Sequence, residues 1–518
     1  MVGRSVKAAV YNRYWASMGG GERHGGRLAQ VLAEDGWQVD LLGPAEVDLD
    51  DLGMHLGLDL RGVRLRVVPE RGDAGLAAVT EDYDLLVNAS YMSRLAARAK
   101  RNVYLCYFPT PADHDLTRLQ RWLIRRVGTR VSGWQMPFEH GIGWFPAEGG
   151  RRRTYTWTSG DGVLVIPEGT DPVIRADFAR VGFPAETILR VVDEAGAELA
   201  SFPVGPQFNR QVVRVADRGP ITVHLVSEAT VPGPSDNRTL GVAVSRMRIG
   251  NRISPRQWVG YRLPWLLRDP TNVSFLTSYD RVLANSEYTR GWIRRRWDVD
   301  ADVLFPPIAL DPLEPAEVRE PVIASVGRFF GPQFGHSKRQ LEMVRFFGEL
   351  VGSGRLRGWR MRIIGGCEPA QQPYLDQVQA AARGLPVDIR VNAPRAEVEE
   401  LLASASIFWS ATGLGEDEER RPWTSEHFGI TTVEAMSGGC VPIVIDRAGQ
   451  REIVRDGVEG YRWTTAGELA ARTLEVAGDP VAQRRLARAA RIRAEEFSEE
   501  AFAARWRAIA ADLGLTPR

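Results

Sequence analysis

Residues 425–436 read SEHFGITTVEAM, and residues 437–445 continue as SGGCVPIVI. The first string places Glu426 and Glu434 on either side of a helix start expected near Gly429. Backbone N–H groups in the first turn of such a helix are unpaired and point at an anion. The second string predicts a helix end followed by a buried strand of the parallel-sheet type. The segment therefore favours an open α/β fold, in which ligands bind near the carboxyl ends of the strands.

Length and composition limit the class of protein. The chain has 518 residues, of which 44% are apolar and 25% charged, so we expect more than one core. The formal net charge of +1 gives no reason to expect nucleic acid as a partner. Three scattered cysteines, Cys106, Cys367 and Cys440, favour a reducing cytoplasm. The apolar runs are too short to cross a membrane, so a cytoplasmic location is expected, with peripheral contact at the inner face of the membrane as an open alternative.

The secondary-structure pattern changes twice along the chain. Strands alternate with helices at the start, short runs separated by Gly, Pro and Asp turns follow, and the α/β pattern then resumes. We therefore expect two Rossmann-like domains that face a cleft, with a β-sandwich inserted in the first. The expected boundaries are 1–138 and 252–308 for the N-terminal domain, 139–251 for the sandwich, 309–497 for the C-terminal domain, and 498–518 for a C-terminal helix that is able to pack back on the N-terminal domain.

Two further features are expected to line the cleft. A run from Gly19 to Gly21 lies between the first strand and a helix, where glycine lets the backbone approach a phosphate or a sugar. Arg328 follows a strand of the C-terminal domain, and Lys338 comes ten residues later. Because the chain contains only three lysines, Lys7, Lys100 and Lys338, the retention of Lys338 hints at a functional need. An arginine and a lysine together suit a diphosphate leaving group.

This set of residues resembles the retaining GT-B glycosyltransferases of the large E-x7-E family. The resemblance rests on Gly19–Gly21, on Arg328 with Lys338, and on Glu426 to Gly429 with Glu434. It covers both α/β domains and omits the sandwich. Within the family, the chain looks most like the branch that contains the α-1,2-mannosyltransferase of lipid-linked oligosaccharide synthesis and bacterial polysaccharide glycosyltransferases.

The resemblance implies a role for each motif. Arg328 and Lys338 would hold the donor diphosphate, Glu426 the transferred sugar, and Glu434 the ribose. The remaining implied donor contacts are Gly20, Gly21, Asn392, Phe428, Gly429 and Ile430. The family retains the anomeric configuration and needs neither a metal nor a cofactor. The run from Asp48 to Asp51 is accordingly interpreted as a solvated turn in a polar loop and not as a metal clamp.

One position departs from the family pattern. Many members carry a histidine after a strand of the first domain, and Tyr107 occupies that position here. His114 lies nearby as a substitute, although a histidine in a loop is often merely solvated. Tyr107 and His114 are therefore the candidates for contacting the acceptor or handling its proton.

The sequence leaves more alternatives open for the acceptor than for the donor. Residues 118–127 and 290–297 combine apolar and basic positions at helical spacing, which suits either an anionic membrane surface or ordinary surface helices. The sandwich aromatics Tyr155, Trp157 and Phe208 either stack on a glycan or belong to its core.

The predicted function is transfer of a hexose from a nucleotide sugar to a glycan or lipid-linked glycan, with mannose from GDP-mannose as the first expectation from the resemblance. The alternatives are a sugar-nucleotide epimerase on the same fold and a non-catalytic glycan-binding assembly protein. The second alternative predicts loss of Arg328, Lys338 or the two glutamates, and all are present.

Overall fold

The structure is a computed structural model of the chain. It describes residues 6–68, 72–128, 139–140, 143–145, 148–150, 153–166, 173–215, 221–231, 239–250, 263–267, 269–310, 318–332 and 335–515.

The N-terminal domain is built on a seven-stranded parallel sheet with the strand order β17-β16-β5-β4-β1-β2-β3. Most of its core strands are continuous apolar runs, as expected of strands covered on both faces. The strands are β1 Lys7–Tyr11, β2 Gln38–Gly43, β3 Val63–Val67, β4 Leu85–Asn88, β5 Arg101–Cys106, β16 Arg281–Ala284 and β17 Asp302–Val303. The helices are α1 Gly20–Glu34, α2 Leu49–Leu56, α3 Gly72–Thr80, α4 Arg118–Leu123 and α7 Glu287–Trp297.

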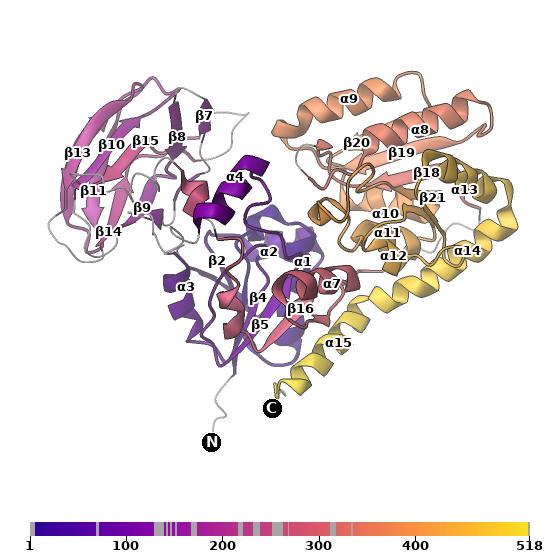
Figure 1. Cartoon of the computed structure of the whole chain (residues 1–518), viewed down its shortest axis with the longest axis horizontal. Coiled ribbons are helices and arrows are strands. Elements are labelled where there is room, and N and C mark those ends of the chain that lie inside the picture. The colour runs from indigo at the N-terminus through magenta and orange to yellow at the C-terminus, as the bar shows by residue number, and fades with distance from the viewer. Residues whose placement is uncertain are drawn as a thin grey trace.

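The inserted module consists of two antiparallel sheets and lies on one side of the molecule (Figure 1). Their orders are β13-β10-β15-β8-β7 and β12-β11-β14-β9-β6. The strands are β6 Glu139–His140, β7 Glu148–Gly150, β8 Arg153–Trp157, β9 Asp161–Ile166, β10 Val173–Ala179, β11 Thr187–Asp193, β12 Glu198–Val204, β13 Asn209–Arg214, β14 Ile221–Val226 and β15 Ala243–Ile249. Alternate residues of the strands, such as Leu189 and Val191, fill a core made of sandwich residues alone. The module therefore has its own core.

The C-terminal domain is a second parallel sheet, with the strand order β20-β19-β18-β21-β22-β23. The strands are β18 Glu320–Val326, β19 Arg360–Gly365, β20 Val387–Val391, β21 Ala405–Ser410, β22 Val441–Ile445 and β23 Tyr461–Trp463. The helices are α8 Gln340–Gly352, α9 Gln372–Ala382, α10 Arg395–Ser404, α11 Ile430–Ser437, α12 Gln450–Ile453, α13 Ala466–Gly478 and α14 Pro480–Ala494. The helix expected near Gly429 is thus α11, with Gly429 at its N-cap.

A final helix, α15 Glu499–Asp512, returns from the C-terminal domain to the N-terminal domain (Figure 1). Its apolar side chains Phe502, Trp506 and Ile509 belong to the same core as the first strands of the chain. Glu499 adds ion pairs with Arg23 and Arg27 of α1, at 2.9 Å and 3.3 Å. The two α/β domains are therefore tied together behind the cleft.

The domains also meet directly at the start of α7. Both carboxylate oxygens of Glu452, on α12, accept hydrogen bonds at 2.8 Å from the backbone N–H groups of Glu287 and Tyr288. A carboxylate from the C-terminal domain thus caps a helix of the N-terminal domain. The Tyr288 hydroxyl reinforces this contact by donating to the Pro422 carbonyl at 3.3 Å.

The structure corrects one detail of the sequence interpretation and describes the second basic segment. Asp48 is the N-cap of α2, where its side chain accepts from the N–H groups of Asp50 and Asp51, so the acidic run begins a helix and is not a turn. Trp292, in the second basic segment, is 9% exposed and packs inside, with the Arg296 guanidinium 5.0 Å from its ring centroid. The apolar side of α7 therefore faces the protein. Within the described residues, no helix is both long enough and apolar enough to span a bilayer.

Candidate active site

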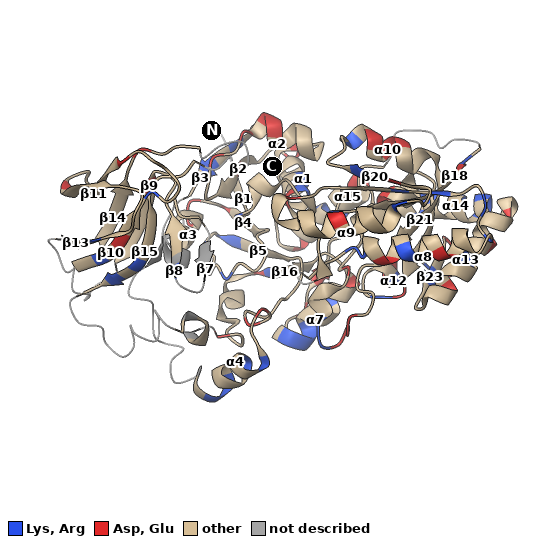
Figure 2. Cartoon of the chain, turned by 90° about the horizontal axis from the view of Figure 1, so that it is seen from above, with Lys and Arg blue, Asp and Glu red and all other residues tan. Residues whose placement is uncertain are grey.

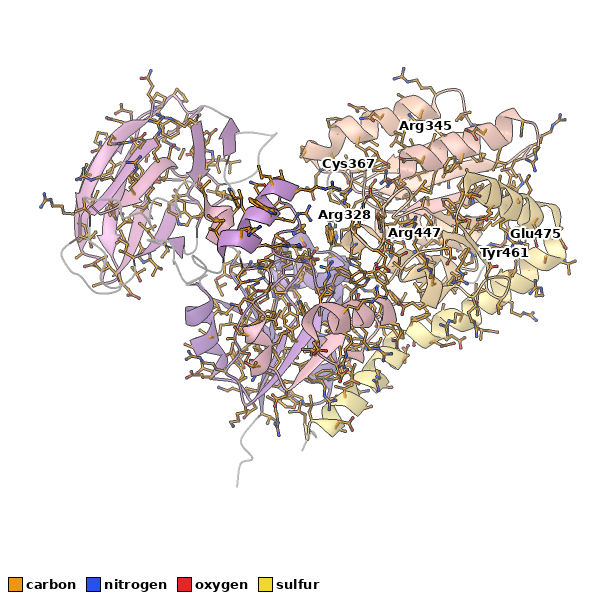
Figure 3. The ribbon with its side chains drawn as sticks, viewed as in Figure 1. Arg328, Arg345, Cys367, Arg447, Tyr461 and Glu475 are labelled. Atoms are coloured by element: carbon orange, nitrogen blue, oxygen red, sulfur yellow. The ribbon has the colours of Figure 1, made fainter. Side chains whose placement is uncertain are left out.

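The carboxyl ends of the C-terminal strands gather the predicted donor residues on one side of that domain. Arg328 follows β18, Asn392 follows β20, and Glu426 lies in the loop after β21. Figure 3 shows Arg328 and Cys367 on the side of the C-terminal domain that faces the rest of the molecule. The Asn392 side-chain oxygen accepts a hydrogen bond at 3.0 Å from the Cys367 N–H, which links the loops after β19 and β20. The loops after β18 and β21, which carry Arg328 and Glu426, are neighbours because these strands are adjacent in the sheet, although they are not consecutive in the chain.

Glu426 forms an ion pair with Lys338, through its Oε2 and the lysine Nζ. Thr412 Oγ1 donates to the same oxygen at 3.3 Å. Burial alone raises the pKa of Glu426, but the positive charge and hydrogen bond of Lys338 outweigh it, so the pKa lies below its usual value. Glu426 is thus held as a carboxylate beside a cation, and 19% of its side-chain surface remains exposed.

Glu434 lies in α11 with its side chain 7% exposed. Its Oε1 accepts a hydrogen bond at 2.8 Å from Arg395 Nη1, at the start of α10. Arg395 also contacts Glu399 one turn later, at 2.9 Å, which fixes the guanidinium. Sequence reasoning missed Arg395, because an arginine at the start of a surface helix carries no signal in this arginine-rich chain. Oε2 of Glu434 has no hydrogen bond to the described residues.

Arg328 and Lys338 are positioned by a glycine and a glutamine. Gly327 has φ +157°, and a Cβ there would lie 2.8 Å from the Lys338 Cγ, so the lysine stem lies directly against the backbone. Gln340 Nε2 donates to the carbonyls of Gly327 and Arg328, at 3.0 Å and 3.1 Å. The Arg328 guanidinium lies 4.8 Å from the Phe330 ring centroid and, among the described residues, forms no ion pair. Its charge is therefore available to a ligand.

Two histidines that sequence reasoning did not place in the site lie beside the Glu426–Lys338 pair. The His427 ring stacks on Phe108 of the N-terminal domain, with ring centroids 4.1 Å apart and planes 7° apart. His336 meets His427 edge-on at 4.8 Å. Burial lowers the pKa of both, that of His427 strongly, and the charge of Lys338 lowers both further. His427 Nε2 is buried and has no hydrogen-bond partner among the described residues, so a neutral imidazole faces the site.

In the N-terminal domain, the glycine run reaches the C-terminal domain. A Cβ on Gly20 would lie 2.8 Å from the Ile430 Cδ1, at the first residue of α11. The run is held by Glu22, which accepts from the Gly19 N–H and the Ser17 hydroxyl, both at 2.8 Å, and from Asn12 Nδ2 at 3.1 Å. The pattern of a glycine N-cap with an acidic residue three positions later is a helix-start signal that could have identified Glu22.

The two candidates for the missing histidine occupy different places. The Tyr107 hydroxyl donates to the Gly21 carbonyl at 2.6 Å, and burial raises the pKa of Tyr107 well above its usual value. Tyr107 therefore supports the glycine run through a protonated hydroxyl. His114 Nδ1 lies 3.0 Å from the Pro111 carbonyl oxygen, and its ring meets Trp423 of the C-terminal domain at 6.2 Å. His114 thus lies where the two domains meet.

The comparisons with known proteins bear on the fold and on the C-terminal domain. The family model described as glycosyl transferases group 1 matches residues 312–493. Solved structures with a similar fold include Anabaena HepE in complex with UDP and glucose, at 11% identity and a TM-score of 0.51, covering 98% of this chain and 99% of that one. Sucrose-phosphate synthase from Thermosynechococcus elongatus is similar at 12% identity and a TM-score of 0.52, over 98% and 99% of the two chains.

The chain has the GT-B fold, and its residues 312–493 match the glycosyl transferases group 1 model. The expected fold is thereby confirmed. In this group 1 domain lie Arg328, Lys338, Asn392 and both glutamates, whereas the glycine run, Tyr107 and His114 lie outside the matched residues. Among curated proteins, the GT-B chain is 24% identical over 239 residues to a GDP-Man:Man(3)GlcNAc(2)-PP-Dol alpha-1,2-mannosyltransferase of Dictyostelium discoideum. That alignment spans 43% of this chain and 45% of the relative.

Proposed function

We propose that this protein is a retaining, metal-independent glycosyltransferase that moves a hexose from a nucleotide diphosphate sugar to a glycan or lipid-linked glycan. The observation that carries the proposal is the Glu426–Lys338 ion pair at the carboxyl end of a parallel sheet, in front of a helix start without a side-chain cap. Cation, carboxylate and helix N-terminus together suit a bound sugar diphosphate.

In the proposed complex, Arg328, Lys338 and the first turn of α11 hold the diphosphate and stabilise the negative charge that develops on it. The bond between the anomeric carbon and the diphosphate oxygen breaks, while the acceptor oxygen bonds to the same face of that carbon. The acceptor proton passes to the departing diphosphate oxygen. The neutral His427 and His336 rings neither add positive charge nor supply a proton at neutral pH, so the two cations carry the stabilisation.

The ribose, the sugar and the nucleobase of the donor are assigned to residues according to which atoms of each residue are already hydrogen-bonded within the protein. Glu434, held by Arg395, keeps one carboxylate oxygen for the ribose hydroxyls. Glu426 contacts the sugar itself. The nucleobase lies near Asn392, whose side chain is occupied by the Cys367 N–H, which leaves the backbone for recognition. GDP-mannose is the first candidate donor because the curated relative is named as a GDP-mannose enzyme.

A thermal-shift series with GDP, UDP and ADP, followed by their hexose conjugates, tests the donor site. We expect one nucleotide to raise the melting temperature, since a ligand that binds only the folded chain stabilises it. Lys338→Ala should abolish that shift. Lys100→Ala is the matched control, because Lys100 is 63% exposed and paired with Asp84 in the N-terminal domain. If no nucleotide stabilises the wild type, the donor-site proposal is wrong.

Turnover of the donor that binds best tests the reaction. Glu426→Ala should lose transfer while retaining nucleotide binding, because Glu426 is assigned to the sugar and not to the nucleotide. NMR of the product reports the anomeric configuration, and activity in EDTA reports the metal requirement. Conversion of the donor sugar in the absence of acceptor would instead indicate an epimerase.

A further inference from the structure

A cavity of about 440 Å³ lies beside the candidate donor site. Its walls come from the N-terminal domain, through α4, the turn after it, α7 and the loops after β4 and β5, and from the loop before Glu426 in the C-terminal domain. Phe108 lines the cavity on one side and stacks on His427 on the other. The cavity therefore adjoins the position proposed for the transferred sugar.

The cavity walls carry a strong excess of positive charge. Five arginines contribute to the lining against a single carboxylate, Asp113. The arginines are Arg94, Arg121, Arg125, Arg296 and Arg420. Figure 2 shows Lys and Arg on both α4 and α7, on the same side of the molecule. A cavity with this charge excess attracts anions.

The arginines differ in how their charges are used. Arg296 is committed to the fold: its Nη1 donates to the Pro109 carbonyl at 3.0 Å, and its guanidinium lies 5.4 Å from the Trp423 ring centroid. Arg121 is half-buried, and its Nε makes no hydrogen bond within the described part of the chain. Arg125 is exposed, and neither it nor Arg121 pairs with a described carboxylate. Arg121 and Arg125 are i and i+4 neighbours and present to the same cavity two cations that have no ion-pair partner in the described part of the chain.

Aromatic rings complete the lining. Trp423 and Trp297 border the cavity on opposite domains, together with Phe108. Aromatic faces are common surfaces for sugar rings, whereas arginine forks suit phosphate and carboxylate groups. This combination of rings and cations matches a sugar that carries an acidic group.

We infer that this cavity is the acceptor site and that it selects an acceptor glycan bearing an oxyanion, a phosphate or a carboxylate, held by Arg121 and Arg125. The inference rests on the proposed function, because it places the acceptor next to the donor sugar at Glu426. Trp423, which is half-buried, contacts the sugar that bears the attacking hydroxyl, while Phe108, 2% exposed, backs the wall of the cavity. The donor residues Arg328 and Lys338 lie outside the cavity lining, so the two anion sites are separable by mutation.

Calorimetric titration of the full chain with three probes tests the inference. The probes are methyl glucoside 6-phosphate, methyl glucuronide and neutral methyl glucoside, each with and without saturating GDP or UDP. We expect at least one anionic probe to bind about tenfold or more tightly than the neutral one. The phosphate and carboxylate arms identify which oxyanion the cavity prefers.

Arginine variants assign that preference to the cavity. Arg121→Gln with Arg125→Gln should remove the preference for the anionic probe and leave nucleotide affinity unchanged. Arg118→Gln is the matched control, since Arg118 is exposed on the same helix and is not among the lining residues. Because Arg125 is exposed, Arg125→Glu should weaken binding of the anionic probe by more than tenfold without changing the melting temperature.

The possible outcomes separate the two claims. Equal binding of all three probes, binding of none of them, or a preference that survives in the double variant would overturn the anionic acceptor site. Absence of nucleotide binding would instead contradict the proposed glycosyltransferase function. The titrations without nucleotide decide the anion preference in either case.

Discussion

At the scale of single residues, the candidate site depends on charges that hold one another. Lys338 keeps Glu426 ionised despite burial, and Arg395 holds Glu434 at 2.8 Å. Removing one member of such a pair leaves the other charge without compensation in a partly desolvated place. The effects of single mutations at this site should therefore exceed the loss of one contact.

Lys338→Ala should lower kcat/KM by about 100-fold or more, as expected when a group that stabilises transition-state charge is removed. It should also change the pH profile. Without the lysine, burial dominates and the pKa of Glu426 rises, so the acidic limb of kcat/KM moves to higher pH. An unchanged acidic limb would show that Glu426 ionisation does not control activity.

His24 makes the fold sensitive to acid. It lies fully buried in α1 between Tyr107 and Phe502, and burial lowers its pKa to about 3. The folded state keeps His24 neutral, whereas the unfolded chain binds a proton near pH 6.5. The contribution of His24 to the stability of the folded state is therefore complete above pH 6.5 and is lost as the pH falls toward 3.

We expect His24→Leu to reduce the loss of unfolding free energy between pH 7.5 and pH 5 by about 2 kcal/mol. Chemical denaturation at both pH values measures it. His55→Leu, at an exposed position of α2, is the control and should leave the pH dependence as it is in the wild type.

At the scale of elements, short helices carry the contacts between domains. The start of α7 is capped by Glu452 from α12, and α11 begins against Gly20 of α1. Burial raises the pKa of Glu452 to about 7, although the N–H groups of Tyr288 and Glu287 oppose the rise. Glu287 and Arg290 are the charged side chains that act on it from α7.

The Glu452 contribution to stability has a defined pH window. With a pKa raised from 4.5 to about 7, the contribution is complete below pH 4.5 and is lost as the pH rises through 7. As the pH rises from 5 to 8, the free energy of unfolding of Glu452→Gln should therefore increase by about 2 kcal/mol relative to that of the wild type. Melting curves of the variant and the wild type at the two pH values measure this change, and Glu500→Gln, at an exposed position, is the control. If the variant differs from the wild type by the same amount at both pH values, the prediction is wrong.

The helix α4 presents two of its apolar side chains outward, while Leu123 packs against a core cluster. Leu119 and Trp122 are 66% and 52% exposed. If α4 contacts an anionic membrane, Leu119→Ser with Trp122→Ser should abolish co-sedimentation with vesicles that contain anionic lipid. If the wild-type protein stays in the supernatant, the membrane hypothesis is wrong.

At the scale of the whole molecule, the sandwich is a separate unit on the N-terminal domain. Its core contains no residue of either Rossmann-like domain. Tyr155, Trp157 and Phe208 pack on one another, with ring centroids 6.2 Å and 5.6 Å apart, and Trp157 is 3% exposed. Trp157 therefore belongs to the core of the module.

Replacing residues 139–251 with a short Gly/Ser linker should leave the nucleotide-induced thermal shift within error of the wild type. The flanking segments already meet, because Leu116 and Ile124 pack with Leu266 on the other side of the insertion. Transfer to a short acceptor and to a long polymer, compared in the same variant, measures the role of the module. Loss of the nucleotide shift would show that the sandwich supports the donor site.

Local sequence patterns were sufficient to predict the helices and strands and part of the candidate site. Alternation of strands and helices, together with glycine at position 429, predicts the parallel sheet and the start of α11 within one residue. The same patterns could not reveal Arg395, His336 or the arginine cavity. Nothing in the neighbourhood of Arg395 distinguishes it from other helical arginines, and the two histidines are 91 positions apart in the chain.

The amino-acid sequence alone determined the fold class and the residue types at the candidate donor site, because backbone propensities and helix starts act over a few residues. Only the tertiary structure decided which charges are paired, which rings stack across the two domains, and which cavity arginines have no carboxylate partner among the described residues. Lys338 reaches Glu426 because β18 and β21 are neighbours in the sheet. Phe108 reaches His427 because the two domains close on each other, and such contacts depend on packing between segments that are distant in the chain.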